Sequence, residues 1–347
     1  MKKLKIGVIG LGGIANFHIS GTLASKDAEV WAICDVNKES LLARATELNI
    51  PESRCYTNYE DMLRAPDVDA VTIGTPNFNH FAVAYEAIKQ RKPFALEKPI
   101  SLDTKEAAIL REMLGNVQVP HMVCFTYRYK AAVRYAKWLI EQGKLGHVNH
   151  IYSQYFQGWA INEKIPLQWR FQKELSGSGA LGDLGSHILD LMRFLVGETH
   201  RVISHADTII RERNLLNAEG KGIVDVDDYC HVLAKLDNGA SSSMSISRFA
   251  YGRGNYQQME IYGTKGSLVY NLEEEDSLYV NLAEEEGKAF RKVEIPDTFK
   301  VDQMQAFFDL LNGNADGLDA SIEDGYINQK TIDSIIESFT QEKWVTI

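Results

Sequence analysis

The chain has 347 residues, of which 45% are hydrophobic and 24% are charged, and its formal net charge is −10. This length exceeds what one hydrophobic core usually supports and suits two domains, and the composition is that of a soluble globular protein rather than a disordered or membrane-spanning chain. The acidic balance and the lack of a Lys/Arg run argue against nucleic acid as a partner, because binding to its phosphates needs a concentrated cationic face.

Short apolar runs alternate with helical periodicity from residue 5 to about residue 125. The runs expected to form strands are 6–9, 29–34, 70–73, 94–96 and 122–125. This alternation is typical of βαβ units, in which helices cover both faces of a parallel sheet. We therefore predict a doubly wound α/β domain over residues 1–126.

A glycine-rich turn follows the first predicted strand and opens a predicted helix. It reads Gly10-Leu11-Gly12-Gly13-Ile14-Ala15, a G-x-G-x-x-A pattern. The first glycine makes a tight turn, the second lets the backbone approach a pyrophosphate, and the alanine permits close packing of helix on strand. The helix N-terminus then attracts the phosphates. We expect this domain to be a Rossmann domain that binds a dinucleotide through Gly10, Gly12, Gly13, Ile14 and Ala15.

Asp35 ends the second predicted strand, about 20 residues after Ala15, where an acidic residue that binds ribose is expected. Its carboxylate can accept hydrogen bonds from ribose hydroxyls and repel the extra phosphate of NADP, which favours NAD as the cofactor. Lys38 lies near Asp35 in the sequence, so use of NADP is not excluded. The alternative is that Asp35 only caps the next helix.

The second half of the chain shows the two-residue alternation of half-buried strands. The predicted strands are 148–156, 231–236, 241–247, 257–262 and 267–270, and the predicted helices are 131–141, 181–196, 301–311 and 322–339. This pattern indicates an antiparallel sheet with helices on one face. We predict an α+β domain over residues 127–347.

Several short motifs occur together in a fixed order. They are Thr75-Pro76-Asn77, Asn79-His80, Glu97-Lys98-Pro99, the stretch from Gly182 to His187, and the stretch from Met259 to Gly266. With the glycine-rich turn, this order resembles the Gfo/Idh/MocA family of sugar and cyclitol oxidoreductases over nearly the whole chain. The resemblance implies cofactor contacts from Thr75, Pro76, Asn77, His80, Glu97 and Lys98. It also implies a cis Lys98–Pro99 peptide, a large open sheet, and homodimers or homotetramers formed through that sheet.

The expected chemistry, oxidation of a secondary alcohol, needs a base for the hydroxyl proton and a group that stabilises the oxygen. Asp183 and His187 are four residues apart on a predicted helix, so the carboxylate can orient the imidazole. Lys98 can stabilise a developing alkoxide. The resemblance likewise gives Lys98, Asp183 and His187 as the catalytic set. The alternative is a metal site formed by Asp183, His187 and Asp190. No further Glu or His lies at a spacing typical of metal ligands, so no metal is expected.

Aromatic and arginine side chains gather near the expected domain boundary. We predict that Arg128, Trp169 and Arg170 bind substrate together with Lys98, Asp183 and His187, because aromatic faces and Arg donors suit a polyol. Core packing is the alternative for Trp159 and Trp169. The expected protein is an NAD-dependent dehydrogenase of a sugar, a sugar derivative or an inositol-like cyclitol. The alternatives are a redox-assisted glycoside hydrolase that keeps its NAD and a sensor that binds the dinucleotide without turnover.

Four cysteines lie far apart and form no C-x-x-C pair, which fits neither a zinc site nor a disulfide framework. They are expected to be reduced thiols in the cytoplasm. No apolar run is long enough to predict a membrane span.

Overall fold

A six-stranded parallel sheet organises the first part of the chain in the computed structural model, which describes residues 3–273, 275–284 and 289–347. The strand order is β3-β2-β1-β4-β5-β6, and every neighbouring pair is parallel. The strands are β1 (Leu4–Ile9), β2 (Ala28–Cys34), β3 (Cys55–Tyr56), β4 (Ala70–Ile73), β5 (Phe94–Leu96) and β6 (His121–Val123). The predicted Rossmann fold is confirmed.

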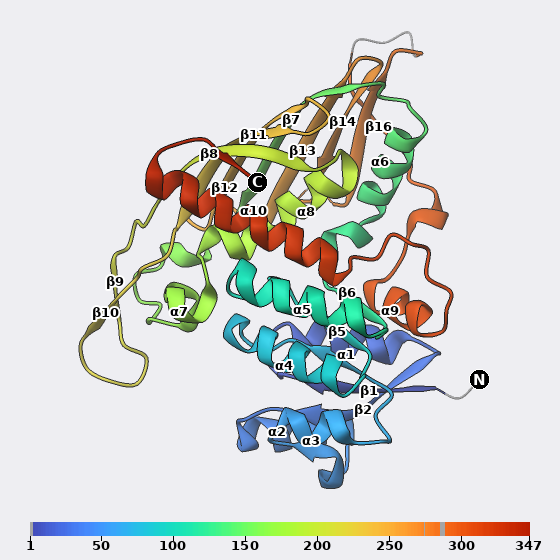
Figure 1. Ribbon diagram of the computed structural model, residues 1–347, viewed down its shortest axis with the longest axis vertical. Helices are drawn as coiled ribbons and strands as arrows, with labels where there is room; N and C mark the ends of the chain where they lie inside the picture. Colours follow the sequence, from blue (N-terminus) through green and yellow to red (C-terminus); the bar gives the residue numbers. More distant parts are fainter. Residues whose placement is uncertain (1–2, 274, 285–288) are drawn as a thin grey trace. The chain divides into compact units, whose positions relative to one another are not determined.

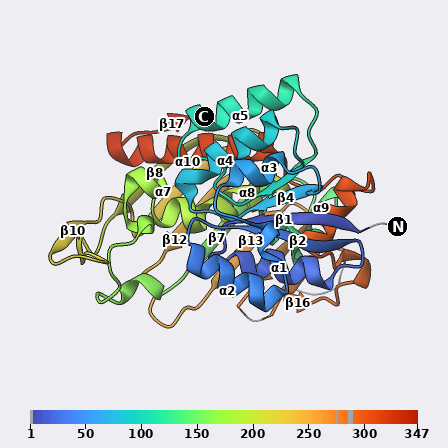
Figure 2. The same cartoon turned by 90° about the horizontal axis from the view of Figure 1, so that it is seen from below.

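Helices cover both faces of this sheet, as Figure 2 shows, with α1 and α2 on one side and α3, α4 and α5 on the other. They are α1 (Ala15–Ala24), α2 (Lys38–Leu48), α3 (Tyr59–Arg64), α4 (Asn77–Lys89) and α5 (Thr104–Asn116). Each side has its own apolar core: Ile19 and Leu41 pack with β1 and β2 on one side, and Val83 and Leu110 pack with β4 and β5 on the other. The loops that follow β1, β4 and β5 therefore leave the same edge of a rigid sheet.

The chain divides into two compact units, Met1–Phe125 with Asp302–Ile327, and Thr126–Val301 with Asn328–Ile347. This division corrects the expected boundaries at one segment, because residues 302–327 join the first unit. Helix α9 (Gln303–Leu311) packs on α1, where a Cβ on Gly21 would lie 2.7 Å from Met304 Cγ. Ala320 belongs to the same core as β4 and β5, and its carbonyl accepts a hydrogen bond from Val123 N.

The second unit is built on a nine-stranded sheet of order β16-β15-β14-β13-β7-β12-β11-β8-β17. Its strands are β7 (Val148–Phe156), β8 (Thr199–Asp207), β11 (Tyr229–Leu236), β12 (Ser241–Ser247), β13 (Tyr256–Gly263), β14 (Gly266–Asn271), β15 (Ser277–Leu282), β16 (Arg291–Lys292) and β17 (Val345–Thr346). All neighbours are antiparallel except β7 and β12. The predicted α+β class with a mostly antiparallel open sheet is confirmed.

One face of the large sheet is buried, because alternate side chains of each strand point to opposite faces. In β11, Val232 and Ala234 are buried while His231 and Leu233 are exposed. Helices α6 (Ala131–Glu141) and α8 (Ser186–Leu195) cover the buried face, and α10 (Ile322–Gln341) crosses it from residue 328 onward (Figure 1). A separate hairpin of β9 (Glu212–Asn214) and β10 (Lys221–Ile223) extends from this unit (Figure 1).

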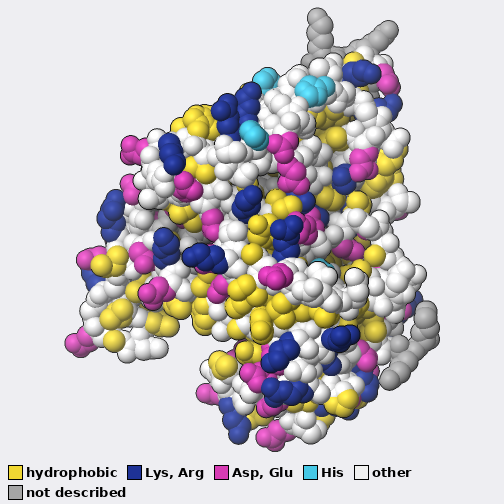
Figure 3. Space-filling model, viewed as in Figure 1, with side chains coloured by type: hydrophobic (Ala, Val, Ile, Leu, Met, Phe, Trp, Pro, Cys, Tyr) yellow, Lys and Arg dark blue, Asp and Glu magenta, His cyan; other side chains and the backbone are white. Residues whose placement is uncertain are grey.

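Charged side chains of both signs lie interspersed over the face of the protein seen in Figure 3. None of the helices that the structure describes combines the length and the apolar character needed to span a bilayer.

Candidate active site

The glycine-rich turn between β1 and α1 has the geometry that a dinucleotide requires. Gly10 has a φ of +86°, and a Cβ there would lie 2.7 Å from the carbonyl oxygen of Gly74, so only glycine fits. Gly12 and Gly13 are exposed, and a Cβ on either would meet no atom within 4 Å. Helix α1 begins after Ile14 without a side-chain cap, and the positive end of its dipole lies at the glycine-rich turn, where it attracts an anion. These residues fit the pyrophosphate of a dinucleotide.

Asp35 lies directly after β2 and holds the glycine-rich turn. Its Oδ2 accepts a hydrogen bond from Leu11 N at 2.9 Å, and its Oδ1 accepts one from Asn37 N at 2.8 Å. Helix α2 is capped instead by Asn37, whose side chain accepts from Ser40 N. The interpretation of Asp35 as only a helix cap is therefore wrong, and a half-buried carboxylate with lone pairs to spare stands beside the turn.

Cofactor preference is expected to depend on Asp35 and the neighbouring Val36, which is 89% exposed. Changing Asp35→Ser with Val36→Arg removes the repulsion of a 2′-phosphate and adds a cation for it. We expect the NADP:NAD ratio of kcat/KM to rise by roughly 10-fold to 100-fold, the worth of a hydrogen bond to a charged group. Val36→Arg alone, which keeps the carboxylate, is the matched control and should move the ratio less. An unchanged ratio in the double variant contradicts the assignment.

The loop after β4 carries Thr75, Pro76 and Asn77 at the carboxyl edge of the sheet, where such folds bind ligands. All three are half-buried, and their contact with a cofactor stays a prediction. The ring of His80 is buried, with Nδ1 2.6 Å from the Pro99 carbonyl oxygen and Nε2 2.7 Å from the Thr75 carbonyl oxygen. Since both ring nitrogens face backbone carbonyls, His80 holds two loops together, and its contact with a cofactor stays a prediction.

The Glu97-Lys98-Pro99 segment follows β5 at the same edge. The Lys98–Pro99 peptide is cis, as expected. Lys98 is half-buried, whereas Glu97 is only 6% exposed. One Glu97 oxygen faces the buried His18 ring at 3.0 Å, and the other accepts from Lys98 N at 3.3 Å. Direct contact of Glu97 with a cofactor stays a prediction, and its observed partners are within its own unit.

In the second unit, Asp183 and His187 lie across an irregular helical turn. Residues Leu181–Gly185 form a π-helical turn, and the α-helix α8 begins at Ser186. The single regular helix predicted over 181–196 is therefore interrupted, and π-helical turns are often found at functional sites. Asp183 is half-buried on this turn, and His187, 8% exposed, stands in the first turn of α8. A Cβ on Gly185 would lie 2.8 Å from Ile246 Cδ1, so glycine lets the turn pack against β12.

A polar aromatic cluster surrounds His187. The Tyr127 ring meets the imidazole edge to face, with centroids 4.7 Å apart, and the Tyr155 ring lies 6.1 Å away. The two tyrosine hydroxyls are 2.6 Å apart, and Asn255 Oδ1 accepts hydrogen bonds from Tyr155 and from Gln157 Nε2, each at 2.8 Å. Burial, then the neighbouring Tyr127 and Asp183, raise the pKa of Tyr155, so its hydroxyl keeps its proton. This cluster offers hydroxyl and amide groups beside the candidate base.

Arg128 forms a buried ion pair within its own unit. Its guanidinium is buried, with Nε donating to Asp190 Oδ2 at 2.8 Å and Nη2 donating to Asp190 Oδ1 at 2.6 Å. This bidentate pair fastens the turn Thr126–Tyr129 to α8, and binding of substrate by Arg128 stays a prediction. The same pair engages both Asp190 oxygens, which removes Asp190 from the alternative metal site.

Trp169 and Arg170 lie in a short turn, Trp169–Phe171, and both are half-buried. The Arg170 guanidinium stacks over the Trp169 ring at 4.3 Å. Trp159 instead packs against the buried Phe171, with ring centroids 5.6 Å apart, in a small apolar core. Substrate binding by Trp169 and Arg170 stays a prediction, and core packing accounts for Trp159.

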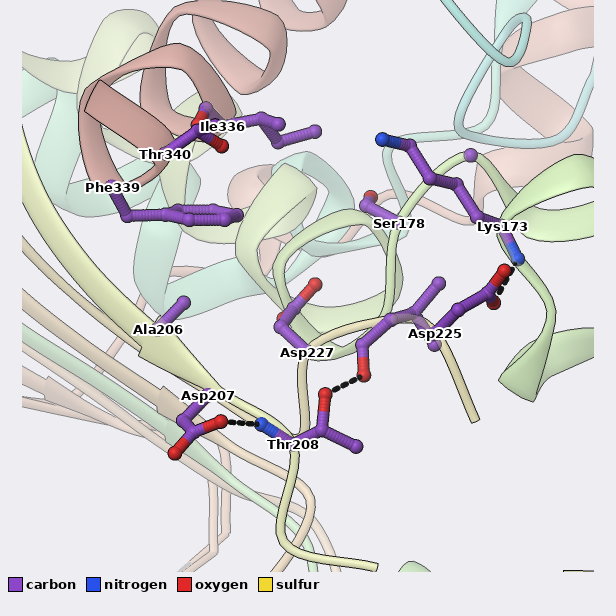
Figure 4. Close-up of a pocket in the computed structure, with 12 residues that line it drawn as sticks. Lys173, Ser178, Ala206, Asp207, Thr208, Asp225, Asp227, Ile336, Phe339 and Thr340 are labelled. Atoms are coloured by element: carbon purple, nitrogen blue, oxygen red, sulfur yellow. Dashed lines mark hydrogen bonds between the residues drawn. The ribbon is translucent and has the colours of Figure 1, made fainter. Parts of the chain in front are cut away.

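A cavity of about 260 Å³ lies behind the segment that leads into the π-helical turn. Figure 4 shows Phe339 and Ile336 of α10 on one side and Asp227 on the other. The Asp227 carboxylate accepts hydrogen bonds from Gly179 N at 2.8 Å and from Leu181 N at 2.7 Å, and burial raises its pKa. None of the residues that line this cavity belongs to the turn or to α8, so Asp227 supports the turn from behind rather than taking part in the site.

The fold and its edge residues define a class of protein. A doubly wound parallel sheet, an exposed glycine turn and a carboxylate at the end of β2 form a dinucleotide-binding domain. The second unit adds Asp183 and His187 on adjoining helical turns, with polar aromatic side chains beside His187. This combination is that of an oxidoreductase that uses a dinucleotide.

Comparisons with known proteins give the family. Residues 4–125 match the oxidoreductase family with an NAD-binding Rossmann fold, and residues 133–269 match the GFO/IDH/MocA C-terminal domain. The levoglucosan dehydrogenase of Pseudarthrobacter phenanthrenivorans is 32% identical, with 100% of this chain and 99% of that protein aligned. The myo-inositol 2-dehydrogenase of Thermotoga maritima is 26% identical over 82% of this chain and 79% of that protein.

Solved structures support the same family. A levoglucosan dehydrogenase in complex with NADH and L-sorbose has a TM-score of 0.93 and 31% identity, covering 100% of this chain and 99% of that one. The chain belongs to the GFO/IDH/MocA family, and it is an NAD-dependent oxidoreductase.

Proposed function

We propose that this protein oxidises a secondary alcohol of a sugar, a sugar derivative or a cyclitol with NAD. The observation that carries the proposal is the placement of Asp183 on a π-helical turn and of His187 directly after it, beside hydroxyl and amide groups. A polyol offers many hydroxyls, and Tyr155, Gln157 and Asn255 can donate to or accept from them. The end-to-end similarity to a levoglucosan dehydrogenase supports the same substrate class.

Each of the three proposed catalytic residues has a distinct role. His187 takes the proton of the reacting hydroxyl as general base. Asp183 orients the imidazole and stabilises it once it is protonated. Lys98 holds the substrate oxygen and stabilises negative charge that develops on it. NAD, when bound, accepts the hydride, and the residues proposed to hold it are Gly10, Gly12, Gly13, Ile14, Ala15, Asp35, Thr75, Pro76, Asn77, Glu97 and Lys98.

A substrate screen tests the proposal directly. Purified protein with NAD is given levoglucosan, myo-inositol or simple aldoses, and NADH is followed by its absorbance. Net NADH formation with at least one polyol is the expected result. Release of a chromogenic aglycone from a glycoside without net NADH would instead indicate a redox-assisted hydrolase. NAD binding without any reaction across the panel would indicate a sensor.

We also propose that the protein is a homodimer or homotetramer that assembles through the exposed face of its large sheet. Leu233 on β11 and Tyr152 on β7 both pair with Ser243 of β12 and are 54% and 50% exposed, which forms an apolar strip on that face. Leu233→Lys is expected to lower the mass measured by light scattering to that of a smaller species. A wild-type monomer, or an unchanged oligomer in the variant, contradicts this.

We further propose a cytoplasmic location. All four cysteines are free thiols, and burial raises the pKa of Cys34 to about 12, which makes it unreactive. Unpaired, buried thiols suit a reducing compartment. Fractionation of cells that produce the protein, with recovery in the cytosol, is the expected result.

A further inference from the structure

The two residues that flank Lys98 are each held by a buried histidine from a different helix of the first unit. His18 of α1 lies 3.0 Å through Nε2 from Glu97 Oε1. His80 of α4 lies 2.6 Å through Nδ1 from the carbonyl oxygen of Pro99. We propose that His18 and His80 are positioning residues that fix the direction of Lys98, an inference that rests on the proposed role of Lys98 in the reaction.

The His18 link acts through the Glu97 carboxylate. Glu97 is buried, and a buried carboxylate needs hydrogen-bond donors to stay in place. His18 Nε2 and Lys98 N reach its two oxygens, at 3.0 Å and 3.3 Å. His18 is fully buried, and its Nδ1 has no hydrogen-bond partner among the described residues, so the ring proton belongs on Nε2. Loss of this donor leaves the carboxylate with the Lys98 N contact at 3.3 Å, so the segment that carries Lys98 is held less firmly.

The His80 link acts on the other side, through Pro99. The same ring reaches the Thr75 carbonyl with Nε2, at 2.7 Å. Carbonyl oxygens only accept, so both contacts are hydrogen bonds at once only when the ring is protonated. Burial has the largest effect on the pKa of His80 and lowers it. The two carbonyls and the charge of Glu97 raise this pKa, and the charge of Lys98 lowers it. The ring donates to both carbonyls when it is protonated and to one of them when it is neutral, so it links the Thr75 loop to Pro99.

Both histidines also connect Lys98 to segments proposed to hold the cofactor. His18 lies on α1, directly after the glycine-rich turn. Thr75 opens the loop between β4 and α4. A change in the glycine-rich turn can therefore reach Glu97 through His18, and a change in the Thr75 loop can reach Pro99 through His80. Each ring nitrogen of His80 contacts a different loop, so a substitution can remove one contact and keep the other.

Paired amide substitutions test this separation, since Asn places its nitrogen near the position of Nδ1 and Gln places its nitrogen near that of Nε2. His80→Gln keeps the Thr75 contact and loses Pro99, so kcat should fall by roughly 10-fold to 100-fold, as expected for misplacement of a catalytic group. His80→Asn keeps the contact with the Pro99 carbonyl and loses the contact with the Thr75 carbonyl. Its Kd for NADH should rise by about 2-fold to 10-fold, the worth of one hydrogen bond, and its kcat should fall less than that of His80→Gln. Equal effects in both variants, or the reverse pattern, overturn the His80 link.

His18 is tested with His18→Gln, which keeps a donor near Nε2, against His18→Leu, which has none. The readout is the rate at which Lys98 is reductively methylated in the protein without cofactor, measured by mass spectrometry. We expect faster modification of Lys98 in His18→Leu than in His18→Gln, with Lys105 of the same unit as the internal reference. Equal Lys98 rates in the two variants, when both are folded by circular dichroism, overturn the His18 link.

A Lys98→Met variant distinguishes failure of this inference from failure of the proposed function. If Lys98→Met keeps its turnover, the lysine is not catalytic and the proposed function is wrong in that role. The methylation rates in the His18 variants and the NADH affinities in the His80 variants need no substrate, so they still decide whether the histidines position this segment.

Discussion

We expect His187→Asn to lower kcat by about 100-fold to 10,000-fold, the usual worth of general acid–base catalysis. Asparagine keeps a polar group of similar reach but cannot take a proton, so the reacting hydroxyl loses its base. His187 belongs to the second unit and is not among the residues that are proposed to bind the dinucleotide, which belong to the first unit. NADH affinity, measured by fluorescence titration, should therefore barely change.

The pH dependence of kcat/KM gives the control for this assignment. In alcohol oxidation the base must be unprotonated, so activity should rise with pH as the base loses its proton. That step should vanish in His187→Asn. Asp183→Asn should instead move it to lower pH, because the imidazolium loses a stabilising charge. Near-normal turnover by His187→Asn would show that the base lies elsewhere, with Lys98 as the leading candidate.

The buried pair of Arg128 and Asp190 carries the second large effect, which falls on stability. Asp190→Leu leaves the buried guanidinium without its carboxylate and should lower the free energy of unfolding by about 3–5 kcal/mol. Arg128→Met should cost a similar amount, because the Asp190 carboxylate then loses its partner. Urea denaturation followed by circular dichroism measures both changes.

A double variant and a surface pair complete this test. Arg128→Met with Asp190→Leu removes both buried charges, and it should unfold at a higher urea concentration than either single variant. Arg211→Met breaks an exposed pair with Asp207, which should change stability by about 0–1 kcal/mol. If Asp190→Leu proves no more destabilising than Arg211→Met, the proposed structural role of the Arg128 pair is wrong.

The parts of the fold that follow from local patterns could be read from the sequence. Strands β4 and β5 were predicted with their observed bounds, because Ala70–Ile73 and Phe94–Leu96 are wholly buried runs between breakers. The alternation of β7 and β12 gave their bounds as well. The two-residue strands β3 and β16 were missed, since so short a stretch has no periodicity.

Contacts between residues that lie far apart in the sequence could not be predicted. Residues 302–327 leave the second unit and join the first through contacts such as that of Met304 with Gly21, which no local pattern reveals. Gln157 and Asn255 meet beside Tyr155 although nearly a hundred residues separate them. The pairing of Arg128 with Asp190 was missed because Asp190 lies on another element.

Isotope transfer tests the central claim, oxidation of a sugar or cyclitol carbon by hydride transfer to NAD, most directly. A polyol that is active in the screen is prepared with deuterium on the reacting carbon and incubated with the protein and NAD. The account predicts that the deuterium appears on the nicotinamide ring of the NADH formed, together with an equal amount of ketone product. Substrate consumption without deuterated NADH, or with release of an aglycone in place of a ketone, would contradict it.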